Sequence, residues 1–575
     1  MCGLLAIFRP GGVDRDEPER LLGLLSHRGP DASAVWMADD RRTALGHTRL
    51  KIIDLSDDAN QPMLSPDGRW ALIYNGEIVN FQTVRAGYRG SWQFRTNGDT
   101  EVVLASFADR GAAAMHDWVG MFAFALFDRE SQRLHLVRDR FGIKPLYWTR
   151  LADGGVAVAS EIPPLLNLVP RVQGDRDTIR TYLETGQYDA SSHTFFAGIH
   201  AIEPGCRAEL DLKTGSLTHS RWYSLAGRVT DLSCASEVEL IERGAFLVET
   251  AIRDHLVADV RVGLNVSGGV DSAVLTRVSA TQIQDLHVFT QDFEPPYSEG
   301  SWVRKVSDGA HLHLCALDRE DIEDRLDWTV RRQAEPFGGV SVIGYDSLYQ
   351  AASDAGITVL LDGNGVDECF LGYTKYTKEA GAGADTRSID GTQSVASDAI
   401  SAELLGDTKI IDVSGRAAGF AEPVKSLAAL DLLATKIPRG LRFNDRMSMG
   451  YSKELRVPFL DHRLVEFAFG VPSDRLLQAG YTKALFRKIA QRWVSPDVAN
   501  AKKRSVQSPQ REWLAHEWQP LVRDVLRSDS FASRGWVNPE RAQTIYARYC
   551  DGNHDNSFFI WQWLGLELWA RAYLD

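Results

Sequence analysis

Residues 265–272 read NVSGGVDS, and this stretch decides the fold of the half of the chain around it. The apolar run before it predicts a buried strand, and the residues after it predict a helix. Two glycines permit a sharp turn whose N–H groups face an anion at the positive end of that helix. Ser267 and Ser272 add hydroxyl donors, and Asp271 offers an oxygen to Mg²⁺. The stretch predicts a phosphate-binding loop, and a capped tight turn is the alternative.

The chain on either side repeats the pattern of a buried strand that runs into a loop. DLHVFTQDF (285–293) and GITVLLDGNGVDE (356–368) both read this way, and residues 237–259 have apolar side chains at helical spacing. Strands that alternate with helices predict a parallel sheet covered on both faces. Ligands of such sheets bind at the carboxyl ends of the strands. A Gly/Ser/Asp/Thr-rich stretch, 381–421, predicts a mobile surface insertion.

The first ~220 residues favour strands and turns, because alternating patterns are separated by Gly, Pro and Asp. The clearest predicted strands are RWALIYNGEIVNF (69–81), GMFAFALFD (120–128), RLHLVRD (133–139) and GVAVAS (155–160). The chain begins MCGLLAIF, in which a cysteine directly precedes an apolar run. Taken alone, Cys2 reads as a small apolar residue that starts an edge strand.

Length and composition predict a folded protein of two or more domains. The chain has 575 residues, 44% of them hydrophobic and 25% charged. Its formal net charge of −13 argues against a nucleic-acid partner. It has neither an apolar run of the ~20 residues that span a bilayer nor the pattern of a secretory signal, so no membrane partner is expected. The six cysteines form no CxxC pair, and we expect a cytoplasmic protein with reduced thiols.

The glycine loop resembles the pyrophosphate loop of the N-type ATP pyrophosphatases, which split ATP to AMP and pyrophosphate while they activate a carbonyl or carboxyl group. DGNGVDECFLGY (362–373) resembles the second acidic loop of these enzymes. The resemblance implies Mg²⁺ ligands at Asp271 and Asp367 and a lysine, Lys483, that stabilises the activated acceptor and the leaving pyrophosphate. Without it, Lys483 reads as a helix-surface lysine. The ATP-binding residues implied are Val266, Ser267, Gly268, Gly269, Asp271, Ser272, Thr290, Asp362, Gly363 and Asn364.

The first part of the chain resembles the class II glutamine amidotransferase domain, which uses an N-terminal nucleophile. The matching motifs, in order, are MCG (1–3), SHRGPD (26–31), GHTRLKIIDL (46–55), YNGEIVN (74–80), TNGDTE (96–101) and GMFAFALFD (120–128). With the synthetase part, nearly the whole chain is similar to the glutamine-hydrolysing asparagine synthetases. That resemblance implies a four-layer αββα sandwich over 1–225, a doubly wound α/β nucleotide domain over 226–575, and a homodimer.

The resemblance also implies the roles of residues in the first part. Removal of Met1 would give Cys2 an α-amino group of pKa ~7.7–8.0, which can act as the base for its thiol. The thiolate then forms a thioester with glutamine and releases ammonia. The oxyanion donors implied are Asn75 and Gly76, for which a hairpin turn is the alternative. The glutamine-binding residues implied are Arg49 and Asp99, which alone read as surface charges, with Ile53, Asn75, Gly76 and Glu77.

These inferences predict a glutamine-dependent amide synthetase that adenylates a carboxylate with ATP and Mg²⁺. Typical asparagine synthetases carry SGEGxDE in the second loop, whereas this chain has a neutral Asn364 in place of the glutamate. A uronic acid or a natural-product carboxylate is therefore an alternative to aspartate as acceptor. A nucleic-acid-modifying pyrophosphatase and a catalytically dead glutamine or nucleotide sensor are further alternatives. Glu454, Arg456 and Asp461 read as a buried ion network, and EPFGG (335–339) as a turn or an acceptor-pocket wall.

Overall fold

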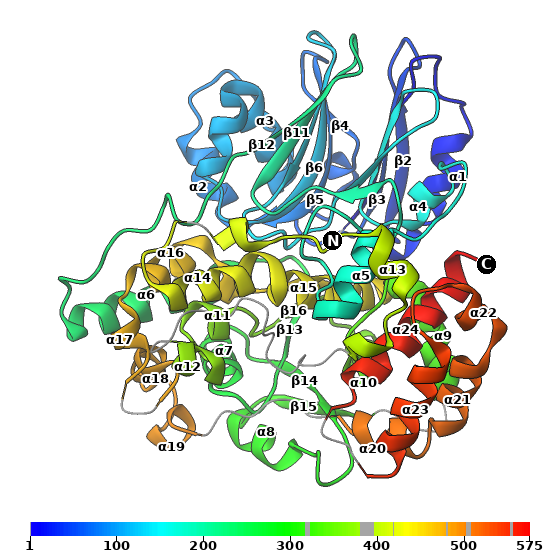
Figure 1. Ribbon diagram of the computed structural model, residues 1–575. Helices are drawn as coiled ribbons and strands as arrows, with labels where there is room; N and C mark the ends of the chain where they lie inside the picture. The colour runs from blue at the N-terminus through cyan, green and yellow to red at the C-terminus, as the bar shows by residue number, and fades with distance from the viewer. Residues whose placement is uncertain are drawn as a thin grey trace.

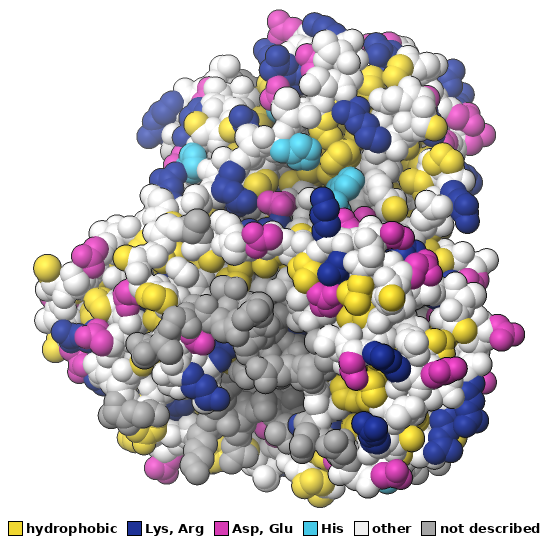
Figure 2. Space-filling view, in the orientation of Figure 1, with side chains coloured by type: hydrophobic (Ala, Val, Ile, Leu, Met, Phe, Trp, Pro, Cys, Tyr) yellow, Lys and Arg dark blue, Asp and Glu magenta, His cyan; other side chains and the backbone are white. Residues whose placement is uncertain are grey.

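The computed structural model describes residues 2–316, 322–379, 396–417, 419–478, 481–501, 508–552 and 556–575. Two parts are stacked on each other (Figure 1). The N-terminal part, blue to cyan in the figure, is built on two sheets, and the larger C-terminal part is built on a third. On the face shown in Figure 2, Lys and Arg side chains are interspersed with Asp and Glu over both parts.

Two antiparallel sheets of six strands form the N-terminal part. The first has the order β10 (Ile199–Ala201), β8 (Tyr147–Arg150), β9 (Val156–Ala159), β1 (Gly3–Phe8), β3 (Thr43–Arg49), β2 (Ala32–Met37). The second has the order β12 (Leu217–Arg221), β11 (Cys206–Asp211), β7 (Arg133–Arg138), β6 (Gly120–Asp128), β5 (Trp70–Ile78), β4 (Met63–Leu64). The predicted strands over 69–81, 120–128, 133–139 and 155–160 are confirmed.

Alternation along the strands gives four layers. Leu4 and Ala6 of β1 belong to the core between the two sheets, whereas Leu5 and Ile7 face the opposite side. That outer face packs against α1 (Glu17–Gly23) and α4 (Pro163–Leu166), and the outer face of the second sheet packs against α2 (Phe81–Gly87) and α3 (Asp99–Arg110). The four-layer αββα sandwich is confirmed.

The third sheet is parallel and has five strands. Its order is β15 (His311–Ala316), β14 (His287–Asp292), β13 (Val262–Asn265), β16 (Val359–Leu361), β17 (Glu454–Arg456). One face packs against α6 (Glu237–His255) and α7 (Val270–Ala280), and the other against α10 (Val340–Asp354) and α15 (Ile437–Gly450). The order reverses between β13 and β16, where such sheets bind ligands. The doubly wound α/β fold is confirmed.

Other helices complete the two parts. Their bounds are α5 (Arg176–Thr185), α8 (Gly300–Val306), α9 (Ile322–Gln333), α11 (Val366–Cys369), α12 (Thr374–Glu379), α13 (Ala402–Asp407), α14 (Pro423–Leu430), α16 (His462–Gly470), α17 (Ser473–Leu476), α18 (Ala484–Ala490), α19 (Pro496–Ala499), α20 (Gln510–Ala515), α21 (Gln519–Arg527), α22 (Asp529–Ser533), α23 (Pro539–Cys550) and α24 (Phe558–Tyr573). Among the described helices, none combines the length and apolar character needed to cross a bilayer.

The predicted insertion over 381–421 falls partly on residues 381–395 and 418, outside the described residues. The described part docks on α5 of the N-terminal half. The backbone N–H of Lys409 donates to Asp177 Oδ1 (2.9 Å), and that of Ile411 donates to Thr181 Oγ1 (3.0 Å). These contacts make this segment part of the boundary between the two halves.

Candidate functional site

Cys2 lies at the start of β1, buried beside the middle of β5. Its backbone N–H donates to Asn75 Oδ1 at 2.9 Å, and Asn75 is fully buried. Because Oδ1 is held in this way, the orientation of the amide is fixed, and its Nδ2 has no hydrogen-bond partner among the described residues. An orphaned buried donor of this kind can bind an oxyanion.

Asn75 and Gly76 lie inside β5, so the hairpin-turn alternative is wrong. A Cβ on Gly76 would lie 2.4 Å from the Met121 carbonyl oxygen of β6. Glycine is therefore needed here because the backbones of β5 and β6 approach each other closely.

A small pocket of about 30 Å³ opens beside Cys2. The predicted residues on its wall are Cys2, Arg49, Ile53, Gly76, Glu77 and Asp99. Sequence reasoning missed others that share this wall, namely Leu50, Ile52, Ala59, Gln61, Tyr74, Gly98, Thr100 and Glu454. Except for Glu454, these residues lie close in sequence to the predicted motifs.

Arg49 and Asp99 are each 5% exposed, so the surface-charge alternative is wrong for both. Arg49 Nη1 donates to the Ser56 carbonyl (2.6 Å), which fixes the guanidinium against a neighbouring loop. Asp99 accepts hydrogen bonds from the Tyr74 hydroxyl (2.8 Å) and the Ile78 N–H (3.0 Å). Burial nevertheless raises the pKa of Asp99 to about 6, so this carboxylate titrates near neutral pH.

One charged side chain of β17, Glu454, lines this pocket from the C-terminal half, and Arg456 of the same strand pairs with it. Arg456 Nε donates to Glu454 Oε1 at 2.6 Å, and Arg456 Nη2 lies 3.5 Å from Glu77 Oε2. All three side chains are buried, which confirms the predicted ion network for Glu454 and Arg456. Asp461 is not part of this network, because it caps α16 and pairs with Arg463.

A second buried network joins Cys2 to the C-terminal half. Arg28 Nε donates to the Cys2 carbonyl (3.1 Å). Its Nη1 donates to Glu161 (2.6 Å) and to Asp445 Oδ2 of α15 (2.8 Å). Burial also raises the pKa of the Cys2 thiol, so the thiol needs a base to become nucleophilic.

The larger cavity, about 390 Å³, lies at the carboxyl ends of β13, β14 and β16. The predicted residues on its wall are Val266, Ser267, Asp271, Ser272, Thr290, Asp362, Gly363, Asn364 and Asp367. Gly268 and Gly269 are not on the wall; the Gly268 carbonyl accepts a hydrogen bond from Trp302 Nε1 (2.5 Å). EPFGG (335–339) is also absent from the wall, and it forms an irregular connection between α9 and α10 rather than a turn.

Lys483 joins the two acidic loops. Its Nζ lies 2.6 Å from Asp271 Oδ2 and 2.8 Å from Asp367 Oδ1. Burial alone would lower the pKa of Lys483, but the two carboxylates hold it above its ordinary value. The residue is 5% exposed and precedes α18 with a φ of +56°, so the surface-lysine alternative is wrong.

Gly372 of the second loop leaves the space that the contact between Asp367 and Lys483 needs. A Cβ at this position would lie 1.8 Å from Asp367 Oδ1 and 2.4 Å from Lys483 Cε. The glycine of the FLGY stretch is therefore required by the acid–lysine cluster.

Sequence reasoning missed eight further residues on this wall, namely Asn265, Gln291, Ser341, Tyr345, Leu348, Gly365, Glu368 and Tyr373. Glu368 accepts a hydrogen bond from the Tyr373 hydroxyl (2.7 Å). Burial, together with the charge of Asp367, raises the pKa of Glu368 to about 7. For Glu368 and Tyr373, the only signal in the sequence was the loop that continues beyond Asp367. No signal in the sequence pointed to the residues of α10, Ser341, Tyr345 and Leu348.

Two family models match the chain in sequence. Residues 1–223 match the glutamine amidotransferase domain, and residues 245–571, more than half of the chain, match asparagine synthase. The chain belongs to the asparagine synthase family. Its matched domains imply glutamine and ATP as substrates of an amidotransferase or ligase enzyme.

Full-length relatives carry more than one name. The chain is 27% identical to asparagine synthetase [glutamine-hydrolyzing] 1 of Bacillus subtilis, over 100% of this chain and 97% of the relative. It is 26% identical to amidase chry2 of Gibberella zeae, over 94% of each chain. It is 27% identical to a putative asparagine synthetase of Mycobacterium bovis, over 100% of this chain and 98% of the relative.

Proposed function

We propose that this family member forms an amide from a carboxylate, ATP and glutamine, with the glutaminase in residues 1–225 and the synthetase in 226–575. The observation that carries the proposal is that Asp271 and Asp367, both on the wall of the 390 Å³ cavity, converge on the buried Lys483. This cluster offers both charge signs to a nucleoside triphosphate. The orphaned amide of Asn75 beside Cys2 supports the glutaminase half of the proposal.

In the glutaminase half, removal of Met1 gives Cys2 the α-amino base that its buried thiol needs. The Cys2 sulfur attacks the side-chain carbonyl of glutamine, and the C–N bond breaks to release ammonia and leave a thioester. Water then hydrolyses the thioester to glutamate. Asn75 Nδ2 and the Gly76 N–H stabilise the oxyanion. Arg49 and Asp99, with Ile53 and Glu77 beside them, hold the carboxylate and ammonium of glutamine.

In the synthetase half, the loop from Ser267 to Ser272 binds the triphosphate at the N-terminus of α7. Asp271 and Asp367 suit Mg²⁺, because their oxygens already meet around a single cationic group, the Lys483 ammonium. When bound, Mg²⁺ neutralises charge on the phosphates. The acceptor carboxylate attacks the α-phosphorus and pyrophosphate leaves, with Lys483 opposing its charge. Ammonia then attacks the acyl carbon and AMP leaves.

Ammonia released at Cys2 reaches the second cavity along the boundary between the halves. Glu454 of β17 lies on the wall of the glutamine pocket. Its neighbour in the sheet, β16, runs directly into Asp362 on the wall of the larger cavity. Adjacent strands therefore link the two pockets. This proximity supports transfer within the protein.

For the acceptor, we propose a carboxylate larger or less charged than free aspartate. Asn364 lines the cavity where related enzymes carry a glutamate, and its amide can neither pair with an ammonium nor act as a base. Tyr345 and Leu348 give the wall an apolar side. Sequence identity to the relatives does not favour aspartate either. A relative named amidase is 26% identical to this chain, and one named asparagine synthetase is 27% identical.

The decisive experiment measures AMP and pyrophosphate with saturating ATP, Mg²⁺ and ammonium across a panel of carboxylates. Uronic acids and aromatic acids should support faster amide formation than aspartate, with one AMP per amide confirmed by mass spectrometry. Efficient coupled conversion of aspartate to asparagine would return the chain to its family's usual acceptor. Absence of pyrophosphate release with every acceptor would favour a glutamine or nucleotide sensor.

A further inference from the structure

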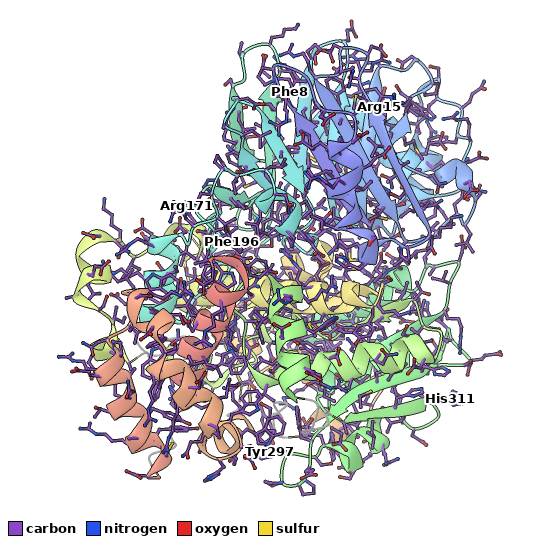
Figure 3. The ribbon with its side chains drawn as sticks, turned by 90° about the vertical axis from the view of Figure 1, so that its right-hand side faces the viewer. Phe8, Arg15, Arg171, Phe196, Tyr297 and His311 are labelled. Atoms are coloured by element: carbon purple, nitrogen blue, oxygen red, sulfur yellow. The ribbon has the colours of Figure 1, made fainter. Side chains whose placement is uncertain are left out.

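Three histidines and an aspartate gather at the amino ends of β14 and β15, the opposite edge of the parallel sheet from the 390 Å³ cavity. The parallel register places His287 beside His311 and Phe289 beside His313. β15 is the last strand in the order of this sheet, and Figure 3 shows His311 at its outer edge.

The potential ligand atoms are close enough to share one ion. Asp285 Oδ1 lies 3.0 Å from His311 Nε2 and 3.6 Å from His287 Nε2. All three ligand atoms lie within 4.8 Å of one another. Tetrahedral Zn²⁺, with bonds of about 2.0–2.2 Å to nitrogen and oxygen, needs neighbouring ligands a little over ~3 Å apart. Small side-chain adjustments therefore suffice.

A cationic side chain already contacts two of these residues. Arg261 Nη2 donates to Asp285 Oδ2 (2.7 Å) and lies 3.0 Å from His287 Nε2. Because a guanidinium has no acceptor, His287 must present a lone pair at Nε2. The cluster is thus arranged to receive positive charge at the same atoms that would bind a metal.

The other ring nitrogen of His287 is also suitably placed. With Nε2 an acceptor, the proton of the neutral ring lies on Nδ1, which is 2.9 Å from His313 Nε2. A metal-binding histidine usually donates its second N–H to such an acceptor, which fixes the ring and its tautomer. His313 is itself stacked on Phe289, with ring centroids 4.5 Å apart.

We propose that Asp285, His287 and His311 bind one divalent late transition-metal ion, for which Zn²⁺ is the best match. Two imidazoles and a carboxylate are a common ligand set for such ions, and water would complete the shell. The side chains of Asp285 and His311 are 62% and 65% exposed, so the ion has direct access. Arg261 gives up its contact with His287 and keeps Asp285 Oδ2. His311 takes the tautomer with its proton on Nδ1, which leaves Nε2 available to the ion.

Such an ion would join β14 to the outermost strand β15, remote from the reacting groups. The site predicts a gain in stability on metal binding, because an ion bound only by the folded state shifts the unfolding equilibrium. It predicts little change in turnover. The proposal does not rest on the proposed function.

The test uses full-length, untagged protein stripped with a chelator and dialysed against Zn²⁺ in excess Mg²⁺, which occupies the oxygen-rich site. The comparison set is His311→Ala, Asp285→Asn and, as a matched control, His516→Ala, another exposed histidine. We expect one Zn²⁺ per chain in the wild type and the control, and loss of that equivalent in the other two. Zn²⁺ should raise Tm only where it binds.

His313→Phe keeps the ring stack but removes the acceptor of His287, and it should weaken Zn²⁺ binding about 10–100-fold. Bound Co²⁺ should show the visible absorption of nitrogen ligation in the wild type and lose it in His311→Ala. Equal Zn²⁺ binding by wild type and His311→Ala, or no binding by the wild type at micromolar Zn²⁺, would overturn the proposal.

Discussion

Arg28 Nη1 and Asp445 Oδ2 form a buried ion pair, 2.8 Å apart, between the two halves of the chain. The same guanidinium donates from Nε to the Cys2 carbonyl. The backbone of the proposed nucleophile is thus held by a residue whose charge is shared between Glu161 of its own half and Asp445 of the C-terminal half.

Asp445→Asn should therefore weaken the glutaminase and the fold together. Arg28 keeps its pair with Glu161, so loss of the charged hydrogen bonds to Asp445 should cost about 1.5–3 kcal/mol of unfolding free energy. We expect lower glutamine-dependent turnover and a smaller loss with ammonium, because the second cavity is not in direct contact with Arg28. Denaturant unfolding and both activities measure this. Asp39→Asn, from a pair whose carboxylate is 87% exposed, should change stability by less than about 1 kcal/mol. Equal stability of the two variants would contradict the role of the pair.

Cys2→Ala should abolish glutamine-dependent amide formation and retain ammonium-dependent formation. The 390 Å³ cavity contains no atom of Cys2, and ammonia from solution replaces ammonia from glutamine. Glutamate release and amide formation are measured separately. Loss of the ammonium-dependent reaction as well would show that the two sites are not separable.

Asp271→Asn should remove both synthetic activities and leave glutaminase activity largely intact. The change takes one negative charge from the Asp271–Lys483–Asp367 cluster and one hard oxygen ligand from Mg²⁺. Pyrophosphate release is the readout. Near-normal ATP turnover in this variant would remove Asp271 from the nucleotide site.

Asn364→Glu should increase turnover of aspartate relative to the best acceptor of the wild type. The substitution places a carboxylate on the cavity wall where an ammonium of aspartate can pair with it. The ratio of kcat/KM values for the two acceptors measures the effect, and Asn364→Gln is the control for side-chain length. An unchanged ratio in Asn364→Glu would place acceptor selection elsewhere on the wall.

Glutamine use should weaken as the pH falls below about 6. Burial raises the pKa of Asp99 to about 6, so the side chain becomes neutral below this pH and cannot pair with the glutamine ammonium. This adds an acidic limb of kcat/KM with a pKa of about 6 to the limb that protonation of the Cys2 α-amino base produces at higher pH. Asp99→Asn should raise the KM for glutamine at every pH, and its pH profile should lack the acidic fall that titrates with Asp99. Glu77 is a second carboxyl on the same wall, and Glu77→Gln should retain the acidic fall that titrates with Asp99.

Local pattern was sufficient to predict the strands and the two acidic loops. The apolar run of β1 and the strand–glycine–helix order around Ser267 are properties of neighbouring residues, and both are confirmed, although β1 lies between β9 and β3 and is not the predicted edge strand. The environment of Lys483 was not predictable, because its burial arises from two loops far away in the chain. The same holds for Arg456, which meets Glu77 across 379 positions. Isolated motifs therefore suggested a hairpin at Asn75 and surface charges at Arg49 and Asp99, and packing contradicts both.

The split charge networks restrict how chimaeric enzymes can be assembled from relatives. The N-terminal half places Arg28 and Glu77 at the boundary, and the C-terminal half must provide their oppositely charged partners, Asp445 and Arg456. A foreign partner that lacks Asp445 would leave Arg28 with Glu161 alone, and one that lacks Arg456 would leave the buried Glu77 without its cation, so either loss would destabilise the boundary. Cavity-wall residues such as Asn364 can be exchanged without this loss of stability, because they face the cavity and not the boundary between the halves. New acceptors are therefore more accessible by grafting cavity walls than by shuffling whole halves.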